Sequence, residues 1–539
     1  MKKSSLTTAV VAGIVGAAGL VSVSNAVNIN PDGLGQALIY PYYTVNKGNT
    51  TLISVVNTTG QTKAVKVRIL EGRNSNEVLD FNLYMSPFDV WTAAITSSGP
   101  EGTNPAAAPA GRLSTGDRSC TVPAIPAGGV DFFNFEYARP DATGTVPKAN
   151  GPFELSRTRE GHIEVIEMGV VTNVGTAAST QFATAAKHSA LGVPANCQIL
   201  VNAWTPDTGA WLGNRSLGIL PPEGGLYGGA EIVNPAIGTN ISYNADAIEG
   251  FYVSVSNTLH YEPGDTRPSL AQAQTNDVGD ATAIVFANGT LFQFPFMGSG
   301  AGLKAVSAVF MHNEIYNDYV TATGGNLTAD SEWVITFPTK RLHIIQPQPA
   351  RLPFRTPYNI ANGGACEPIG LAFWNREEQQ ITTPGGVDFS PRPTTTVVGP
   401  SLCFEAQVVT FNQTNIGDYL TPGTNRSSVF GSYYARNIST GSLNQGWARI
   451  TLGDQSATSS TQNFLPIAVP STGTALIPNA LVGLPVTGFW ASNFAGTGTP
   501  GVLANYSLVH KHRADRLVAG VTVSTVTGNP IWRVGSAPQ

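Results

Sequence analysis

The chain has 539 residues and a formal net charge of −5, from 30 Lys and Arg against 35 Asp and Glu. Charged residues make up 12% of the sequence, against about 25% in an average soluble protein, so it offers no basic footprint for nucleic acid or anionic lipid. With 42% hydrophobic residues, 58 Gly and 37 Pro, the chain can build a large core joined by many turns.

The first 26 residues have the pattern of a secretory signal peptide. Lys2 and Lys3 form a positive start, an apolar run follows from Ala9 to Leu20, and small residues at Ser24–Ala26 precede the expected cut. No later stretch is long and apolar enough for a membrane helix. We therefore expect an exported chain over residues 27–539, without a transmembrane span after signal removal, in the periplasm, at the cell surface or outside the cell.

Residues 51–96 are the clearest guide to the architecture. Four runs rich in Val, Ile, Leu, Phe, Tyr and Trp are separated by the turn sequences NTTGQ, EGRNSN and SPFD. Polar and apolar residues alternate from Lys63 to Ile69, which is typical of a strand with one face in the core and one in water. The pattern predicts a β-meander that forms part of a β-sandwich.

The later segments show the same pattern of short apolar runs separated by Gly- and Pro-rich turns. We predict strands over residues 161–174 and 198–204, and short helices over residues 180–191 and 303–320, the N-terminal half of the latter being equally compatible with a strand.

A proline-rich joint, QPQPARLPFRTP at residues 346–357, is the best candidate for a domain boundary. We predict an N-terminal β-sandwich region over residues 27–350, holding two sandwiches that divide within residues 97–160, and a C-terminal β-sandwich domain over residues 351–539. The layout resembles immunoglobulin-like sandwiches. The expected fold class is all-β, with two or more antiparallel sandwich domains and one or two short helices.

Four cysteines occur, and none lies in a CxxC motif. An even number in an exported protein predicts disulfides in place of zinc or redox chemistry. Three pairings are possible, and proximity in the sequence favours Cys120–Cys197 and Cys366–Cys403.

Short catalytic signatures such as GxSxG, HExxH and GxxxxGK[ST] are missing, which argues against an enzyme without excluding one. The best catalytic candidates are Glu160, His162 and Glu164 in REGHIEVIEMG, which share one face if this segment is a strand. Two carboxylates and an imidazole suit a metal ion or an acid/base pair. The alternative is the wet face of a strand, whose charges deter pairing at its edge.

Glu314 and Asp318 lie four residues apart in the second predicted helix and could share a cation there. Calcium is therefore the one cofactor that the sequence leaves open. The alternative is a solvated helix face. The run His510–Arg513 is the densest cationic stretch, and we expect it to form an exposed turn.

Trp204 and Trp211 flank the loop sequence TPDTGA, and Tyr227 lies downstream. Aromatic faces on a β-scaffold can stack on sugars, so these residues are candidates for glycan binding. The alternative is core packing.

Together these patterns predict an exported, non-catalytic protein of the bacterial cell envelope or extracellular matrix. It would act by surface contact or self-association, as an adhesin, a surface-coat subunit or a filament subunit, since strand edges and neutral faces suit such contacts. Its partners would be further copies of itself, other surface proteins or glycans, and not nucleic acid. The alternative is a secreted carbohydrate-binding protein or carbohydrate-active enzyme.

Overall fold

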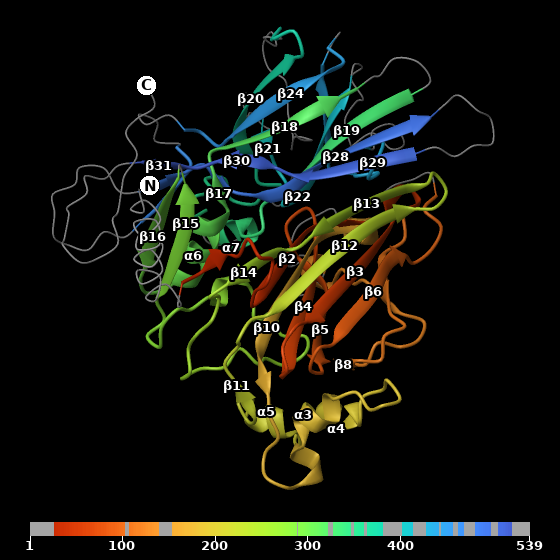
Figure 1. Cartoon of the computed structure of the whole chain (residues 1–539), viewed down its shortest axis with the longest axis vertical. Coiled ribbons are helices and arrows are strands. Elements are labelled where there is room, and N and C mark those ends of the chain that lie inside the picture. Colours follow the sequence, from red (N-terminus) through yellow and green to blue (C-terminus); the bar gives the residue numbers. More distant parts are fainter. Residues whose placement is uncertain are drawn as a thin grey trace, which may run out of the picture.

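The computed structural model shows a mostly β fold (Figure 1). Strand pairs run antiparallel in the sheets, with one parallel pair, β22–β23, in the described part. No helix in the described ranges has the length and hydrophobicity needed to cross a membrane. The structure describes residues 26–102, 107–138, 154–287, 289–321, 327–345, 350–359, 364–380, 401–412, 427–440, 443–455, 462–467, 480–496 and 505–519.

Two sheets are built from residues before 250, and they pack face to face over one hydrophobic core. The first sheet has the order β1 (Asn28–Ile29), β14 (Asp246–Glu249), β2 (Ala37–Thr44), β10 (Glu160–Val171), β4 (Thr62–Glu71), β5 (Glu77–Met85) and β8 (Cys120–Val122), with β11 (Ile219–Leu220) paired to β10. The second sheet has the order β13 (Thr239–Asn244), β12 (Leu226–Asn234), β3 (Thr50–Asn57), β6 (Val90–Ser97), β7 (Gly111–Ser114) and β9 (Val130–Asp131).

Two further sheets lie beyond these, at the top of Figure 1. We call them the middle sheet and the outer sheet. The middle sheet has the order β23 (Ala435–Ser439), β22 (Ala406–Asn412), β19 (Leu327–Thr336), β28 (Thr487–Gly496) and β29 (Asn505–Lys511). The outer sheet has the order β21 (Ser401–Leu402), β20 (Glu367–Asn375), β24 (Gln445–Leu452), β18 (Glu314–Val320) and β30 (Arg513–Asp515).

The middle sheet is covered on both faces. On one face Trp333 and Phe411 share a core with residues of the outer sheet. On the other face Phe489 stacks on Tyr243 of the second sheet, with ring centroids 4.7 Å apart, and belongs to the core of the first two sheets. The four sheets are therefore packed against one another as one body.

Smaller elements complete the described part of the fold. The remaining strands are β15 (Ala281–Ala287) with β16 (Thr290–Phe296), β17 (Met311–His312) with β27 (Leu484–Pro485), and β25 (Phe464–Pro466) with β26 (Ala480–Val482) and β31 (Leu517–Ala519). The α-helices are α2 (Phe135–Ala138), α3 (Phe182–Ala186), α4 (Cys197–Ala203), α5 (Ala210–Gly213), α6 (Ala301–Phe310) and α7 (Lys340–Ile344).

The four strands predicted within residues 51–96 are present as β3, β4, β5 and β6, but the single meander is wrong. β3 pairs with β6 in the second sheet, whereas β4 pairs with β5 in the first. The turns after β3 and after β5 therefore carry the chain from one sheet to the other. The alternation in the sequence requires one core-facing side for each strand, and two stacked sheets provide it as well as one sheet does.

The polar side of β4 is buried, contrary to the prediction that it faces water. Lys66 and Arg68 are buried like the core residue Val67. Helices α3, α4 and α5 and the chain after β14 cover this side of the first sheet, as the shared hydrophobic cluster shows. The Lys66 Nζ donates to the Glu262 carbonyl (3.0 Å), which fixes the covering segment above the strand.

The predicted boundary at residue 350 falls within the middle and outer sheets. β18 and β19 precede it, yet they pair with β24, β22 and β28, which follow it. The sheets therefore do not divide at residue 350. The strand order does not confirm the immunoglobulin-like arrangement that the sequence analysis predicts.

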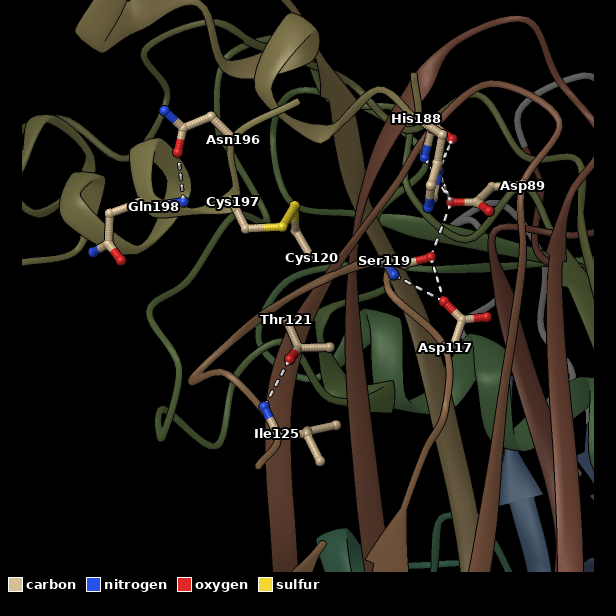
Figure 2. The surroundings of a disulfide bond; sticks show 11 residues. Asp89, Asp117, Ser119, Cys120, Thr121, Ile125, His188, Asn196, Cys197 and Gln198 are labelled. Atoms are coloured by element: carbon tan, nitrogen blue, oxygen red, sulfur yellow. Dashed lines mark hydrogen bonds and ion pairs between the residues drawn. A yellow bond between two sulfur atoms is a disulfide. The ribbon is translucent and has the colours of Figure 1, made fainter. Parts of the chain in front are cut away.

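Three local predictions are corrected by the structure. Residues 197–203 form helix α4, not a strand, because the Asn196 side chain caps the helix by accepting from the Gln198 amide (3.2 Å; Figure 2). Residues 303–320 are half helix and half strand: α6 ends at Phe310, and β18 buries alternate residues, Ile315, Asn317 and Tyr319. The helix predicted over residues 180–191 is the shorter α3.

Both favoured disulfides are confirmed. Cys120 of β8 is bonded to Cys197 at the start of α4, which ties the helices to the edge of the first sheet (Figure 2). Cys366, next to β20, is bonded to Cys403. Two disulfides indicate folding in an oxidising compartment.

Candidate functional site

The outer sheet has one face in the core and one face open to solvent. Ile315, Phe373 and Ile450 point into the core shared with the middle sheet. Because successive side chains of a strand point to opposite sides, their neighbours form the other face of this sheet, and the sheet itself lies at the top of Figure 1. We call this surface the outer aromatic face and define it by Glu314, Tyr316, Asp318, Trp374, Trp447, Arg449, Thr451, Arg513 and Asp515.

A stacked pair of indoles forms the centre of this face. Trp374 and Trp447 lie directly opposite each other on β20 and β24, with ring centroids 4.2 Å apart and planes at 16°. The ring of Tyr316 lies 6.4 Å from that of Trp447. Trp447 remains 41% exposed. Clustered exposed aromatic residues mark contact surfaces, because tryptophan and tyrosine contribute most of the binding energy in many interfaces.

Charged groups surround the aromatic centre. The Arg449 guanidinium lies 5.8 Å from the Trp374 ring and 3.7 Å from a carboxylate oxygen of Glu314. Glu314 also accepts from the Thr451 hydroxyl (3.2 Å) and from the Tyr316 hydroxyl. These groups are partly exposed, so their attraction is weakened by water and is easily replaced by contacts to a partner.

Glu314 and Asp318, the predicted cation pair, are both on this face but do not meet. They stand on strand β18 and not on a helix, so their Cα atoms are about 13 Å apart. Glu314 is engaged by Arg449, whereas Asp318 is exposed. Among the described residues, no three His, Cys, Asp or Glu side chains are grouped so that they could hold a metal ion.

Glu160, His162 and Glu164 lie on β10, a central strand of the first sheet, and all three are buried. The alternative prediction, that these residues form the solvent-exposed face of a strand, is therefore wrong. Glu160 accepts hydrogen bonds from the Tyr42 hydroxyl (2.7 Å) and the Tyr433 amide (2.7 Å), which come from the first sheet and from the chain before β23.

His162 and Glu164 have different surroundings from Glu160. Glu164 forms an ion pair with Arg68 (2.6 Å), and burial raises its pKa against the opposing effect of that guanidinium. Both ring nitrogens of His162 lack a hydrogen-bond partner among the described residues. Burial lowers the pKa of His162 to about 3, so its imidazole stays neutral. These three buried residues therefore do not form a common site that is open to solvent.

The predicted aromatic candidates are divided between two places. Trp211 is fully buried and stacks on Tyr84, with centroids 5.3 Å apart. Trp204 is partly buried and donates its indole N–H to the Tyr84 hydroxyl (2.8 Å). Both line a cavity of about 630 Å³. Tyr227 is 44% exposed on β12 of the second sheet.

The cationic run His510–Arg513 is exposed at His510, Lys511 and Arg513, but it is not a turn. Its residues end β29 and begin β30, and the His512 Nε2–H donates to the Val334 carbonyl (2.7 Å). Burial lowers the pKa of His512 to about 4. Lys511 pairs with Asp246 of the first sheet. The run therefore joins the middle sheet to the first.

Sequence reasoning missed Trp374 and Trp447, the centre of the outer aromatic face. The sequence of their strands, LAFWN and GWARITL, contains a period-2 pattern that could have indicated this face. In the second strand Ala448 and Ile450 are core residues, so Trp447 lies on the opposite side. Which side of these strands meets solvent depends on the packing of the whole sheet. Comparison with protein-family models, curated proteins and solved structures finds no match for this chain.

Proposed function

We propose that this chain is an exported, non-catalytic β protein of the bacterial cell envelope or extracellular matrix that self-associates through its outer aromatic face. The stacked Trp374–Trp447 pair, in which Trp447 is 41% exposed, is the observation that carries the proposal. The N-terminal signal sequence and the two disulfides support export, to the periplasm, the cell surface or the exterior. The finer assignment of the paired sheets as immunoglobulin-like sandwiches belongs to the same proposal.

A second copy of the chain suits this surface because its charges are self-complementary. Glu314 and Asp515 are paired on neighbouring strands and form an acidic row across the outer sheet. Arg449 and Arg513, which both pair with Tyr316, form a basic row two residues further along β18. A two-fold axis that lies in the plane of the interface, parallel to these rows and midway between them, sets the acidic row of one copy against the basic row of the other. Isologous contacts of this kind are the commonest in homo-oligomers.

The position of the acidic candidates supports a non-catalytic role. Glu160 and Glu164 are buried and occupied by internal hydrogen bonds or ion pairs. Reacting carboxylates need access to a substrate, and a glycosidase holds its pair across a cleft. The internal partners of these residues favour a role in stability.

Light scattering and negative-stain imaging of residues 27–539 test the proposal. We expect the wild-type protein to form dimers or larger assemblies, and the W374A/W447A variant to remain a folded monomer at the same concentration. Tyr227→Ala removes a comparably exposed aromatic residue from the second sheet and serves as the matched control, which should assemble like wild type. A wild-type protein that stays monomeric, or a double variant that assembles normally, would falsify self-association through this face.

A further inference from the structure

A large cavity lies beside helices α4 and α5, which are at the opposite end of the molecule from the outer sheet (Figure 1). Its volume is about 630 Å³. One wall is formed by the chain from Trp204 to Pro222 and the other by residues 255–267. A second cavity of about 490 Å³ shares Arg215, Asn257, Thr258, Leu259 and Tyr261 with the first. Both volumes are within the usual range for ligand sites, and their shared residues make one extended groove.

The centre of the groove carries two guanidinium groups on one aromatic ring. The Cζ atoms of Arg215 and Arg267 lie 4.2 and 4.4 Å from the ring centre of Tyr261. Arg267 is paired with Asp265 (2.7 Å). Arg215 is exposed and, within the described residues, has no carboxylate at ion-pair distance. Glu262 is the other acidic residue of the lining.

The remaining lining supplies hydroxyl and amide groups rather than a continuous apolar surface. Asn214, Ser216, Asn257 and Thr258 line the cavity together with Arg215, and Trp204 is also part of the lining. Neutral donors and acceptors beside an aromatic side chain suit a ligand with many hydroxyl groups. An arginine without an acidic partner suits a carboxylate, which its planar fork binds with two parallel hydrogen bonds.

We propose that this groove binds an oligosaccharide that carries carboxylate groups, with Arg215 as the residue that selects the charge. One carboxylate lies against the Arg215 guanidinium, and the sugar hydroxyls meet Asn257, Thr258 and Ser216. The groove extends over two cavities, so more than one sugar unit is accommodated. This inference goes beyond self-association and uses a different surface.

The groove is held in shape before any ligand enters. The Cys120–Cys197 disulfide fixes α4 to the first sheet, and the Trp211 indole donates to the Leu217 carbonyl (2.9 Å). One ring nitrogen of His260 lies 3.0 Å from the Arg215 carbonyl. A preformed site loses little conformational entropy on binding, which favours affinity.

Calorimetric titration tests the proposal with two probes of equal length. Tetragalacturonate presents a carboxylate on every unit, whereas maltotetraose presents none. We expect residues 27–539 to bind tetragalacturonate at least about ten-fold more tightly than maltotetraose, because a charge-assisted bidentate contact is lost with the neutral sugar. Raising the salt concentration should weaken binding of the acidic probe.

Arg215→Gln should weaken binding of tetragalacturonate by about ten-fold. Asn257→Ala, on the opposite wall, should weaken it by a smaller factor and gives a second test. Arg118→Gln removes an exposed arginine outside the groove and should bind within two-fold of wild type by this reasoning. Absence of wild-type binding, equal binding of the neutral sugar, or unchanged binding by Arg215→Gln overturns the proposal.

The two proposals fail separately. The W374A/W447A variant should bind tetragalacturonate like wild type, since neither tryptophan lines the groove. Arg215→Gln should assemble like wild type, since Arg215 is not part of the outer aromatic face.

Discussion

The first sheet and the outer sheet carry charged residues in similar alternating patterns, yet they use them in opposite ways. Lys66 and Arg68 on β4 are buried beneath helices and loops, whereas Arg449 and Arg513 stand on a face that the other sheets leave uncovered. Alternation determines which side chains share a face. Whether that face meets water depends on which other segments of the chain pack over it.

The pairing distances follow this difference in burial. Arg68 lies 2.6 Å from both Glu77 and Glu164, whereas Arg449 lies 3.7 Å from Glu314. A buried charge must be closely paired, because removing it from water costs several kcal/mol. A charge at the surface keeps its hydration and gains at most about 1 kcal/mol from its partner.

The largest expected effect comes from removing the cation of the buried network. Arg68→Ala leaves Glu77 and Glu164 without their shared partner, and we expect the free energy of unfolding to fall by about 3 to 5 kcal/mol at pH 8. Urea unfolding monitored by tryptophan fluorescence measures this. The loss should be smaller at pH 5, because unpaired buried carboxyl groups take up protons there. A loss below 1 kcal/mol at both pH values contradicts the assignment.

The next effect concerns the covalent tie that holds the covering helices on the first sheet. Replacing Cys120 and Cys197 with alanine opens a loop closed across 77 residues, and we expect a loss of about 2 to 4 kcal/mol. The C366A/C403A variant is the matched control, since that bond spans 37 residues. Hydrogen exchange should increase at α3, α4 and α5 in the first variant only. If hydrogen exchange at α3, α4 and α5 is unchanged, the disulfide does not hold these helices on the first sheet.

A smaller effect is expected from Glu332, a buried carboxyl group of the middle sheet. Burial raises its pKa from 4.5 to about 7, although the Val429 and Phe430 amides donate to it (2.9 and 3.2 Å). The folded state therefore holds a proton that the unfolded state releases above pH 4.5. The stability from this group is full below pH 4.5 and is lost as pH rises through 7.

Glu332→Gln removes this titration. Between pH 5 and 8 the wild-type protein should lose about 1 to 3 kcal/mol of stability relative to the variant. Urea unfolding at four pH values measures the two slopes. Parallel profiles for the two proteins would show that the carboxyl group is ionised in the fold throughout this range.

The smallest effect is expected at the open face. A double-mutant cycle of Arg449→Ala and Glu314→Gln should give a coupling energy of about 0.2 to 1 kcal/mol, and 0.5 M salt should reduce it further. At a protein concentration where the chain is monomeric, a coupling above 2 kcal/mol would mean that the chain itself covers the outer aromatic face as it covers the first sheet, and the comparison between the two faces would no longer hold.

Local sequence features predicted the strands of residues 51–96 and both disulfides, because turn residues and cysteine spacing act over short distances. They did not predict how the strands divide between sheets, since β3 and β6 pair across two intervening strands. The helical start at Cys197 depends on the Asn196 cap and the disulfide, which override the β-rich appearance of QILVNAW.

The candidate site was harder to predict, for a related reason. Glu160, His162 and Glu164 share the sequence pattern of a solvent-facing strand, and only long-range packing buries them. Trp204 and Trp211 lie close together, with ring centroids 5.6 Å apart. Their role in lining the groove depends on residues 255–267, which no local pattern connects to them.

The outer sheet and the helices α3 to α5 lie at opposite ends of the long axis of the molecule (Figure 1). A dimer joined through its outer sheets therefore carries the helices α3 to α5, and the grooves beside them, toward its two far ends. Two distant grooves on one rigid particle can bind two separate polysaccharide chains at once. Such a particle cross-links polysaccharide chains. Its avidity rises only where two binding segments, on two chains or on one folded chain, are separated by about the length of the dimer.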